Sequence, residues 1–169
     1  MGDAQLAVNW PVPFTVTAPA DWGIGGEATT ATSVEIVDGT GLRTVLAAFL
    51  KSPDLPEVWV ERLTTNEALD ASEPQPVELG TASGHVFDVR LNDSASECAR
   101  GTLGGRCVTL HGPEDGLVWV IEDGRAARIW VLDVEGETVM FSSDAREDRF
   151  EAWVPKIDEV VNSIEWQKP

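Results

Sequence analysis

Two glycine-containing turns that join three apolar segments constrain the fold more than any other feature of the sequence. The dipeptides Asp123-Gly124 and Glu135-Gly136 separate apolar segments at residues 117–122, 126–134 and 137–142. Glycine accepts the positive φ that a tight hairpin turn requires. The pattern therefore predicts a three-stranded antiparallel meander, one face of which must be covered by another element.

Further segments have the length and alternation of strands. They lie at residues 13–17, 33–37, 58–63, 76–79, 84–91 and 107–110. Because the two helical segments described next lie far apart, with hairpins between them, the order of elements argues against a parallel Rossmann-type sheet.

Two segments have the periodicity of helices. A short amphipathic helix is predicted to end at Ser52-Pro53, where proline disfavours a further turn. Its apolar residues are Leu42, Val45, Leu46, Phe49 and Leu50. A longer C-terminal helix has Asp144 as its predicted N-cap, Glu147 as the capping-box partner and Pro155 as the expected site of a kink. Its apolar stripe consists of Phe150, Trp153, Ile157, Val160, Val161 and Ile164.

These elements predict an α+β fold. We expect a mostly antiparallel β-sheet with a short helix after the second strand and a long C-terminal helix packed on it, as a layered sandwich. A chain of 169 residues is long enough for one domain with its own core, and we place that single domain at residues 12–167. Residues 1–11 show no period and end in Trp10-Pro11, which indicates a flexible tail or tether.

The charge of the chain excludes several kinds of partner. Twelve Lys and Arg residues against 29 Asp and Glu residues give a formal net charge of −17. A surface this negative repels nucleic-acid phosphates and anionic lipid. No apolar run is long enough to cross a bilayer, so we expect a soluble chain that does not insert directly into a membrane. Cations, neutral ligands and basic proteins remain possible partners, and the acidity by itself also favours solubility.

Two cysteines, Cys98 and Cys107, enclose a glycine-rich segment. Their spacing is too long for a CxxC motif, and there is no second pair to complete a metal cage. We predict that a disulfide joins them and that the protein matures in an oxidising compartment. Two unrelated free thiols are the alternative.

The opening residues Met1-Gly2-Asp3 lack the basic and apolar segments of a signal peptide. We interpret them as a start that follows a removed signal or anchor, although a cytoplasmic protein can begin in the same way.

Residues Gly23 to Ala28 fit a loose G-x-G-x-x-G/A pattern. A dinucleotide site needs a helix beginning there, so that helix amides meet the pyrophosphate. The next residues are β-leaning and lack a helical stripe, so we interpret the segment as a loop and expect no cofactor.

The remaining candidates do not form a catalytic set. Ser83 and His85 lie close in sequence without the G-x-S-x-G turn that a serine nucleophile needs, and His111 stands before a Gly-Pro turn. A cation site that spans a hairpin would take its ligands from the acids Asp115, Glu122 and Asp123. Acids at turns are ordinarily solvated, so we predict neither a metal site nor catalytic residues.

The chain has seven tryptophans and no tyrosine. Core packing is the expected role of those in apolar strands or in the helix stripe, namely Trp59, Trp119, Trp130 and Trp153. Burial is less assured for Trp10 and Trp22, and an exposed indole can stack on a sugar or enter a partner's pocket.

Three parts of the chain resemble the PsbP-like fold, as in secreted actinobacterial lipoproteins of unassigned function. The opening from Phe14 through Pro19 to Trp22 resembles the entry strand of the PsbP-like fold. The segment from Pro76 through Gly84 to Asp88-Val89, followed by the cysteine pair, resembles the lipoproteins. The ending from Phe150 to Trp166 is similar to the closing helix of both groups. The resemblance implies an assembly or interaction protein without catalytic residues.

We therefore predict a non-catalytic, extracytoplasmic binding or interaction domain that is membrane-tethered in the full-length protein and binds a protein or cell-envelope component. One alternative is a small-ligand receptor, for a sugar or a cation, with a pocket lined by tryptophan and acids. A second is a hydrolase with an unrecognised site. An apolar pocket with convergent polar groups would favour the receptor, and a flat apolar patch rimmed by charge would favour the interaction module.

Overall fold

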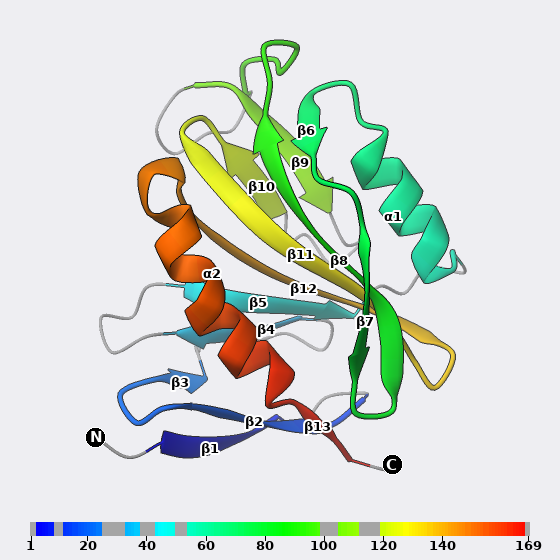
Figure 1. Cartoon of the computed structure of the whole chain (residues 1–169), viewed down its shortest axis with the longest axis vertical. Coiled ribbons are helices and arrows are strands. Elements are labelled where there is room, and N and C mark those ends of the chain that lie inside the picture. The colour runs from blue at the N-terminus through cyan, green and yellow to red at the C-terminus, as the bar shows by residue number, and fades with distance from the viewer. Residues whose placement is uncertain are drawn as a thin grey trace.

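A sheet of eight strands forms the centre of the computed structural model (Figure 1). The structure describes residues 3–8, 12–24, 33–37, 43–49, 54–98, 105–111 and 119–167. The strands of the sheet run in the order β3-β4-β5-β12-β11-β8-β6, and β7 also pairs with β8. Their bounds are β3 Gly23–Ile24, β4 Ser33–Val37, β5 Arg43–Phe49, β6 Leu69–Ala71, β7 Gln75–Leu79, β8 Ala82–Leu91, β11 Arg125–Val134 and β12 Glu137–Arg146. Every pairing in it is antiparallel, which confirms the predicted α+β class.

Strand β11 is an interior strand of the sheet, because it pairs with both β12 and β8. Trp130 lies opposite Phe141 on one side and Val86 on the other. The turn from β11 to β12 places Glu135 and Gly136 at φ of 57° and 89°. Tight hairpin turns need these positive values, so the hairpin predicted at Glu135-Gly136 is confirmed.

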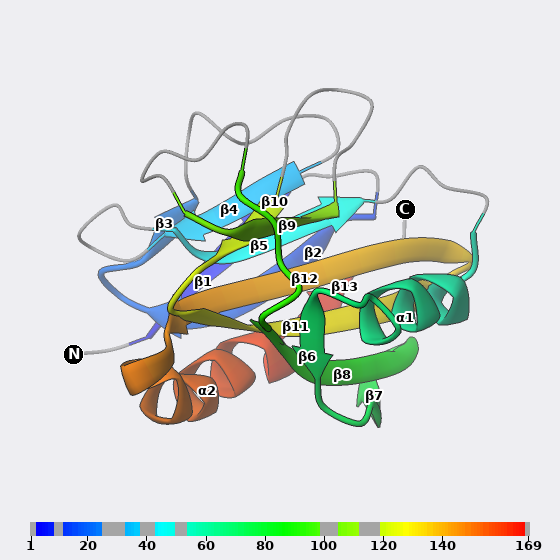
Figure 2. The ribbon, with the colours of Figure 1, turned by 90° about the horizontal axis from the view of Figure 1, so that it is seen from above.

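Each face of the sheet carries its own core and helix. Helix α2 (Glu147–Asn162) buries Phe150, Ile157, Val160 and Val161. On the opposite face, α1 (Pro56–Thr64) buries Trp59 and Leu63 in a cluster with Phe87 and Val89. Strands β9 (Cys107–His111) and β10 (Trp119–Glu122) add Leu110 and Ile121 to that second cluster. Figure 2 shows this strand pair and α2 on opposite sides of β11 and β12.

A small sheet of order β1-β2-β13 joins the two ends of the chain. It consists of β1 (Asp3–Val8), β2 (Phe14–Pro19) and β13 (Glu165–Trp166). Phe14 lies opposite Trp166 in the register, and their rings meet edge to face at 5.4 Å between centroids. The indole Nε1 of Trp166 donates a 2.8 Å hydrogen bond to the carbonyl of Leu79. The C-terminal segment therefore links the small sheet to the β7–β8 hairpin.

The predicted short helix at residues 42–50 is wrong, because Arg43–Phe49 form strand β5 between β4 and β12. The predicted strand at residues 58–63 is also wrong, because that segment belongs to α1. Pro56 suits the first turn of a helix, and Trp59 and Leu63, four residues apart, bury the same face. A short apolar segment fits the periodicity of a helix as well as that of a strand. Its pairing with neighbouring strands decides which of the two forms.

Three smaller expectations are also corrected. Strand β10 pairs with β9 rather than with β11, whose second edge β8 occupies, so only the β11–β12 part of the predicted meander forms. Residues 3–8, predicted to lie in a tail, pair with β2 as β1. Helix α2 begins at Glu147 after Arg146 without a side-chain cap, and the predicted cap, Asp144, binds Arg125 instead. Pro155 does lie within α2.

Replacing Gly84 with alanine is expected to destabilise the domain by about 3 kcal/mol, because the new methyl group overpacks the β8–β11 contact. A Cβ at Gly84 would lie 2.0 Å from the carbonyl oxygen of Val131. Urea unfolding measures the change. Gly23→Ala in β3 is the matched control, since no atom lies within 4 Å of the position that a Cβ would take there. Equal stability of the two variants would contradict the described packing.

Candidate functional site

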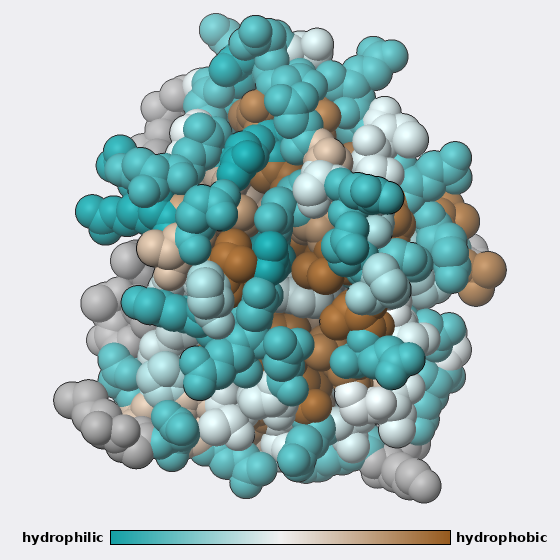
Figure 3. Space-filling view, viewed as in Figure 1, coloured by the Kyte–Doolittle hydropathy of each residue, from teal (hydrophilic) through white to brown (hydrophobic). Residues whose placement is uncertain are grey.

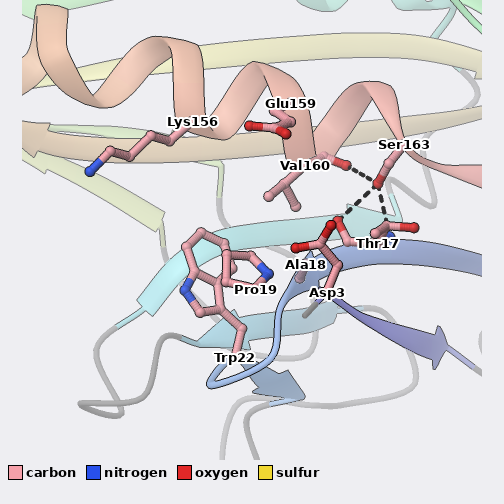
Figure 4. Close-up of a pocket in the computed structure, with 9 residues that line it drawn as sticks. All are labelled: Asp3, Thr17, Ala18, Pro19, Trp22, Lys156, Glu159, Val160 and Ser163. Atoms are coloured by element: carbon pink, nitrogen blue, oxygen red, sulfur yellow. Dashed lines mark hydrogen bonds between the residues drawn. The ribbon is translucent and has the colours of Figure 1, made fainter. Parts of the chain in front are cut away.

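A groove of about 340 Å³ lies where α2 passes over β2 and the turn that follows it (Figure 4). Its residues come from β1, β2, the turn and the second half of α2, so both ends of the chain contribute. They are Asp3, Thr17, Ala18, Pro19, Trp22, Lys156, Glu159, Val160 and Ser163. The volume is near the lower end of the range of small-molecule sites, roughly 300–1,000 Å³.

The end of α2 is hydrogen-bonded to the strand beneath it. The hydroxyl of Ser163 accepts a 2.8 Å hydrogen bond from the Thr17 amide and lies 3.0 Å from the Thr17 carbonyl oxygen. It also lies 2.7 Å from the carbonyl oxygen of Val160. The side chain of Val160 is buried and points from the helix toward β2. Together with the buried Ala18 of β2, it gives the groove an apolar floor.

Trp22 forms an aromatic wall of the groove. Its amide donates a 2.9 Å hydrogen bond to the carbonyl of Pro19, which closes the turn after β2. The half-buried ring stacks on that of Trp153 of α2, with 6.2 Å between centroids and 26° between planes. The Nε1 of Trp153 in turn donates a 2.9 Å hydrogen bond to the hydroxyl of Ser143. The position of the Trp22 ring is therefore fixed from two elements.

Three charged side chains border the groove, and all three are exposed. They are Asp3 of β1 and Lys156 and Glu159 of α2. Within the part of the chain that the structure describes, none of these three makes an ion pair or a side-chain hydrogen bond. Their charges are available to a ligand.

Arg128 of β11 holds α2 over the sheet. Its guanidinium donates to both carboxylate oxygens of Asp88 at 2.8 and 3.0 Å, and to Asp158 of α2 at 2.6 Å. The hydrogen bonds that Arg128 donates to Asp88 raise the pKa of Arg128, because they stabilise its charged form against partial burial. The ion pair with Asp158 therefore anchors the second half of the helix, two residues from Lys156.

The predicted disulfide is present, because Cys98 and Cys107 are bonded with 5.4 Å between their Cα atoms. Two backbone hydrogen bonds flank the bridge, Cys98 N to Gly105 O and Cys107 N to Ser96 O, each 3.0 Å long. The neighbouring Arg106 binds both carboxylate oxygens of Asp123 at 3.1 and 2.8 Å. The hydrogen bond from Arg106 lowers the pKa of Asp123. Asp123 therefore serves as an ion-pair partner, and the bridge lies on a different element from the groove.

The other sequence candidates do not gather into a site. Gly23 and Ile24 form β3, while the rest of the glycine motif, through Ala28, lies outside the described residues. Ser83 and His85 lie on the continuous strand β8 rather than on a sharp turn. Asp115 and the side chain of His111 also lie outside the described residues. Among the residues described, no three potential metal ligands come together.

The tryptophans divide between core and groove. Trp59 and Trp130 are buried, as predicted, whereas Trp153 is half-buried and supports Trp22. Trp10 and the side chain of Trp119 lie outside the described residues. The sequence pattern left the burial of Trp22 open and did not indicate Asp3, Lys156 or Glu159 as groove residues. The polar residues Lys156 and Glu159, three apart and next to the apolar Val160, mark the boundary between the exposed and the buried face of the helix. That boundary is the signal that could have indicated them.

The surface offers narrow apolar strips rather than one broad patch on the face shown in Figure 3. Hydrophobic side chains show between α2 and the β7–β8 hairpin, interrupted by hydrophilic ones (Figure 3). The half-buried Val77 and Val86 of that hairpin pack against the core. No helix in the described ranges is long and apolar enough to cross a membrane.

Comparison with protein-family models finds no match, and no curated protein matches either. Similar solved structures include LpqN of Mycobacterium tuberculosis, which is involved in cell envelope biogenesis, at 13% identity and a TM-score of 0.47 over 99% of this chain and 93% of that one. The cyanobacterial PsbP of Synechocystis matches at 13% identity and a TM-score of 0.47, over 91% of this chain and 86% of that one.

A protein of Bacteroides thetaiotaomicron matches at 14% identity and a TM-score of 0.42 over 92% of this chain. The match covers 45% of that protein, so this chain spans less than half of its length. A PsbP is thus among the similar structures, as the sequence resemblance implies.

Proposed function

We propose that this chain is an extracytoplasmic, non-catalytic binding domain whose ligand occupies the groove between α2 and β2. The observation that carries the proposal is the combination of a fixed indole wall, an apolar floor and charged side chains without partners in the described part of the chain. Ligand sites typically join an apolar lining to a few placed polar groups in this way. In the full-length protein the domain is tethered to the membrane, and the ligand belongs to a protein or cell-envelope component.

The side chains around the groove favour binding over catalysis. A nucleophilic mechanism needs a hydroxyl or thiol beside a general base. The hydroxyl of Ser163 contacts backbone atoms of Thr17 and Val160, and both cysteines are consumed by the disulfide. The lining offers carboxylates and an ammonium group, which suit recognition of a ligand.

The disulfide supports an extracytoplasmic location. Such bonds persist in oxidising compartments and are rare in the cytosol. The bridge closes a short loop with a sequence separation of 9, and chain-entropy models give a stabilisation of about 2–3 kcal/mol for loops of this size.

We expect protein purified without reductant to contain no reactive thiol after denaturation, and its mass to be two hydrogens below that of the reduced chain. The Cys98→Ser/Cys107→Ser variant should lose about 2–3 kcal/mol of unfolding free energy. Thiol titration, mass spectrometry and urea unfolding measure these properties. Two free thiols in protein taken from an oxidising compartment would remove the argument for the location.

The groove itself is tested by a thermal-shift screen of named probes. The panel holds glucose, N-acetylglucosamine, choline, agmatine, capped amino acids and inorganic phosphate. We expect at least one chemical class to raise the melting temperature of the wild-type protein and to lose this effect with Trp22→Ala, because binding to the folded state stabilises it by mass action.

The matched control is Val58→Ala, which removes an exposed apolar side chain from α1 on the other face. It should respond to the probes as the wild type does. Probes that stabilise the wild-type and Trp22→Ala proteins equally, or no stabilising probe at all, would count against the groove as the binding site.

A further inference from the structure

The charges at the groove indicate the class of its ligand. Asp3 and Glu159 bring two carboxylates and Lys156 brings one ammonium group. In Figure 4 the carboxylate of Asp3 points from the strand side toward α2. The side chain of Lys156 extends along the helix away from Asp3 and Ser163. Among the described residues that line the groove, two are acidic and one is basic, and the basic side chain points away from Asp3.

The two acids of the groove are among the carboxylates of the described residues that no arginine neutralises. Elsewhere, arginines neutralise carboxylates in ion pairs. These arginines are Arg62, Arg90, Arg106, Arg125, Arg128 and Arg146. Asp3 and Glu159 have no such partner in the described part of the chain. A net charge of −17 adds a long-range field that concentrates cations at the surface.

We propose that the groove binds an organic cation, with a guanidinium or ammonium head on an alkyl stem. This inference rests on the proposed function, because it names the ligand class of the same groove. An indole face attracts such a head, and the carboxylates of Asp3 and Glu159 neutralise it. The apolar floor of Ala18 and Val160 suits the stem. A phosphate or another anion would face two carboxylates and one lysine.

Calorimetric titration with a matched pair of probes measures how much the positive charge of the ligand contributes to its affinity. N-acetyl-arginine methylamide and N-acetyl-citrulline methylamide have nearly the same shape and differ in charge. We expect the arginine probe to bind about tenfold more tightly, through cation–π and carboxylate contacts. Its affinity should fall as salt is raised, because these charges lie near the surface.

Charge substitutions at the rim give effects of opposite sign. Asp3→Asn and Glu159→Gln should each lower the affinity for the arginine probe by about threefold, and Lys156→Gln should raise this affinity by a similar factor. Glu61→Gln on α1, which lies on the other face, is the control and should leave binding unchanged. All of these positions are exposed, so the folded state should tolerate the substitutions.

The outcomes separate the two proposals. Equal binding of the citrulline probe, or weaker binding of the arginine probe by Lys156→Gln, would overturn the proposal of a cationic ligand and indicate a neutral or anionic one. If binding still depended on Trp22, the groove would remain supported as the binding site. Binding that is unchanged by Trp22→Ala would overturn both the groove as the binding site and its cationic ligand. Among positive results, tighter binding of free agmatine indicates a small-molecule cation, and tighter binding of the capped arginine indicates a basic side chain of a protein partner.

Discussion

The packing of α2 on the central sheet is the constraint on which the rest of the structure depends. Its stripe of apolar residues closes one core, and Arg128 ties the helix to β8 and β11 through Asp158 and Asp88. The guanidinium satisfies carboxylates from two elements, and removing it would leave two like charges facing each other in a partly buried site. Because the helix is held at Asp158, in its second half, its last turn lies over β2. The groove is a consequence of that placement.

The meeting of segments near the two ends of the chain gives the groove its chemistry. The strand β2 pairs with β1 from the N-terminus and β13 from the C-terminus, so Asp3, Trp22 and Glu159, far apart in sequence, line one cavity. Trp22 and Trp153 hold each other by stacking, and the hydrogen bond from Trp153 to Ser143 connects the pair to β12. The rigid aromatic wall reduces the ordering that binding would require.

The sequence predicted the features that depend on local chemistry. The turn at Glu135-Gly136, the strands β2, β4, β7, β8, β9 and β11, the C-terminal helix and the Cys98–Cys107 pairing all follow from turn residues, alternation and spacing. It failed where distant contacts decide. Arg43–Phe49 becomes a strand through pairing with β4 and β12, and Asp144 leaves its predicted capping role because Arg125 binds it. The groove could not be predicted, since its position depends on how α2 lies over β2.

The most direct test of the groove as the ligand site is ¹⁹F NMR of protein labelled with 5-fluorotryptophan. Each of the seven tryptophans reports on its own surroundings, and Trp→Phe variants assign the resonances. On titration with N-acetyl-arginine methylamide, we expect the resonances of Trp22 and Trp153 to shift while those of the buried Trp59 and Trp130 stay in place. A shift confined to Trp59 or Trp130, or no shift at Trp22 at saturating probe, would contradict this expectation.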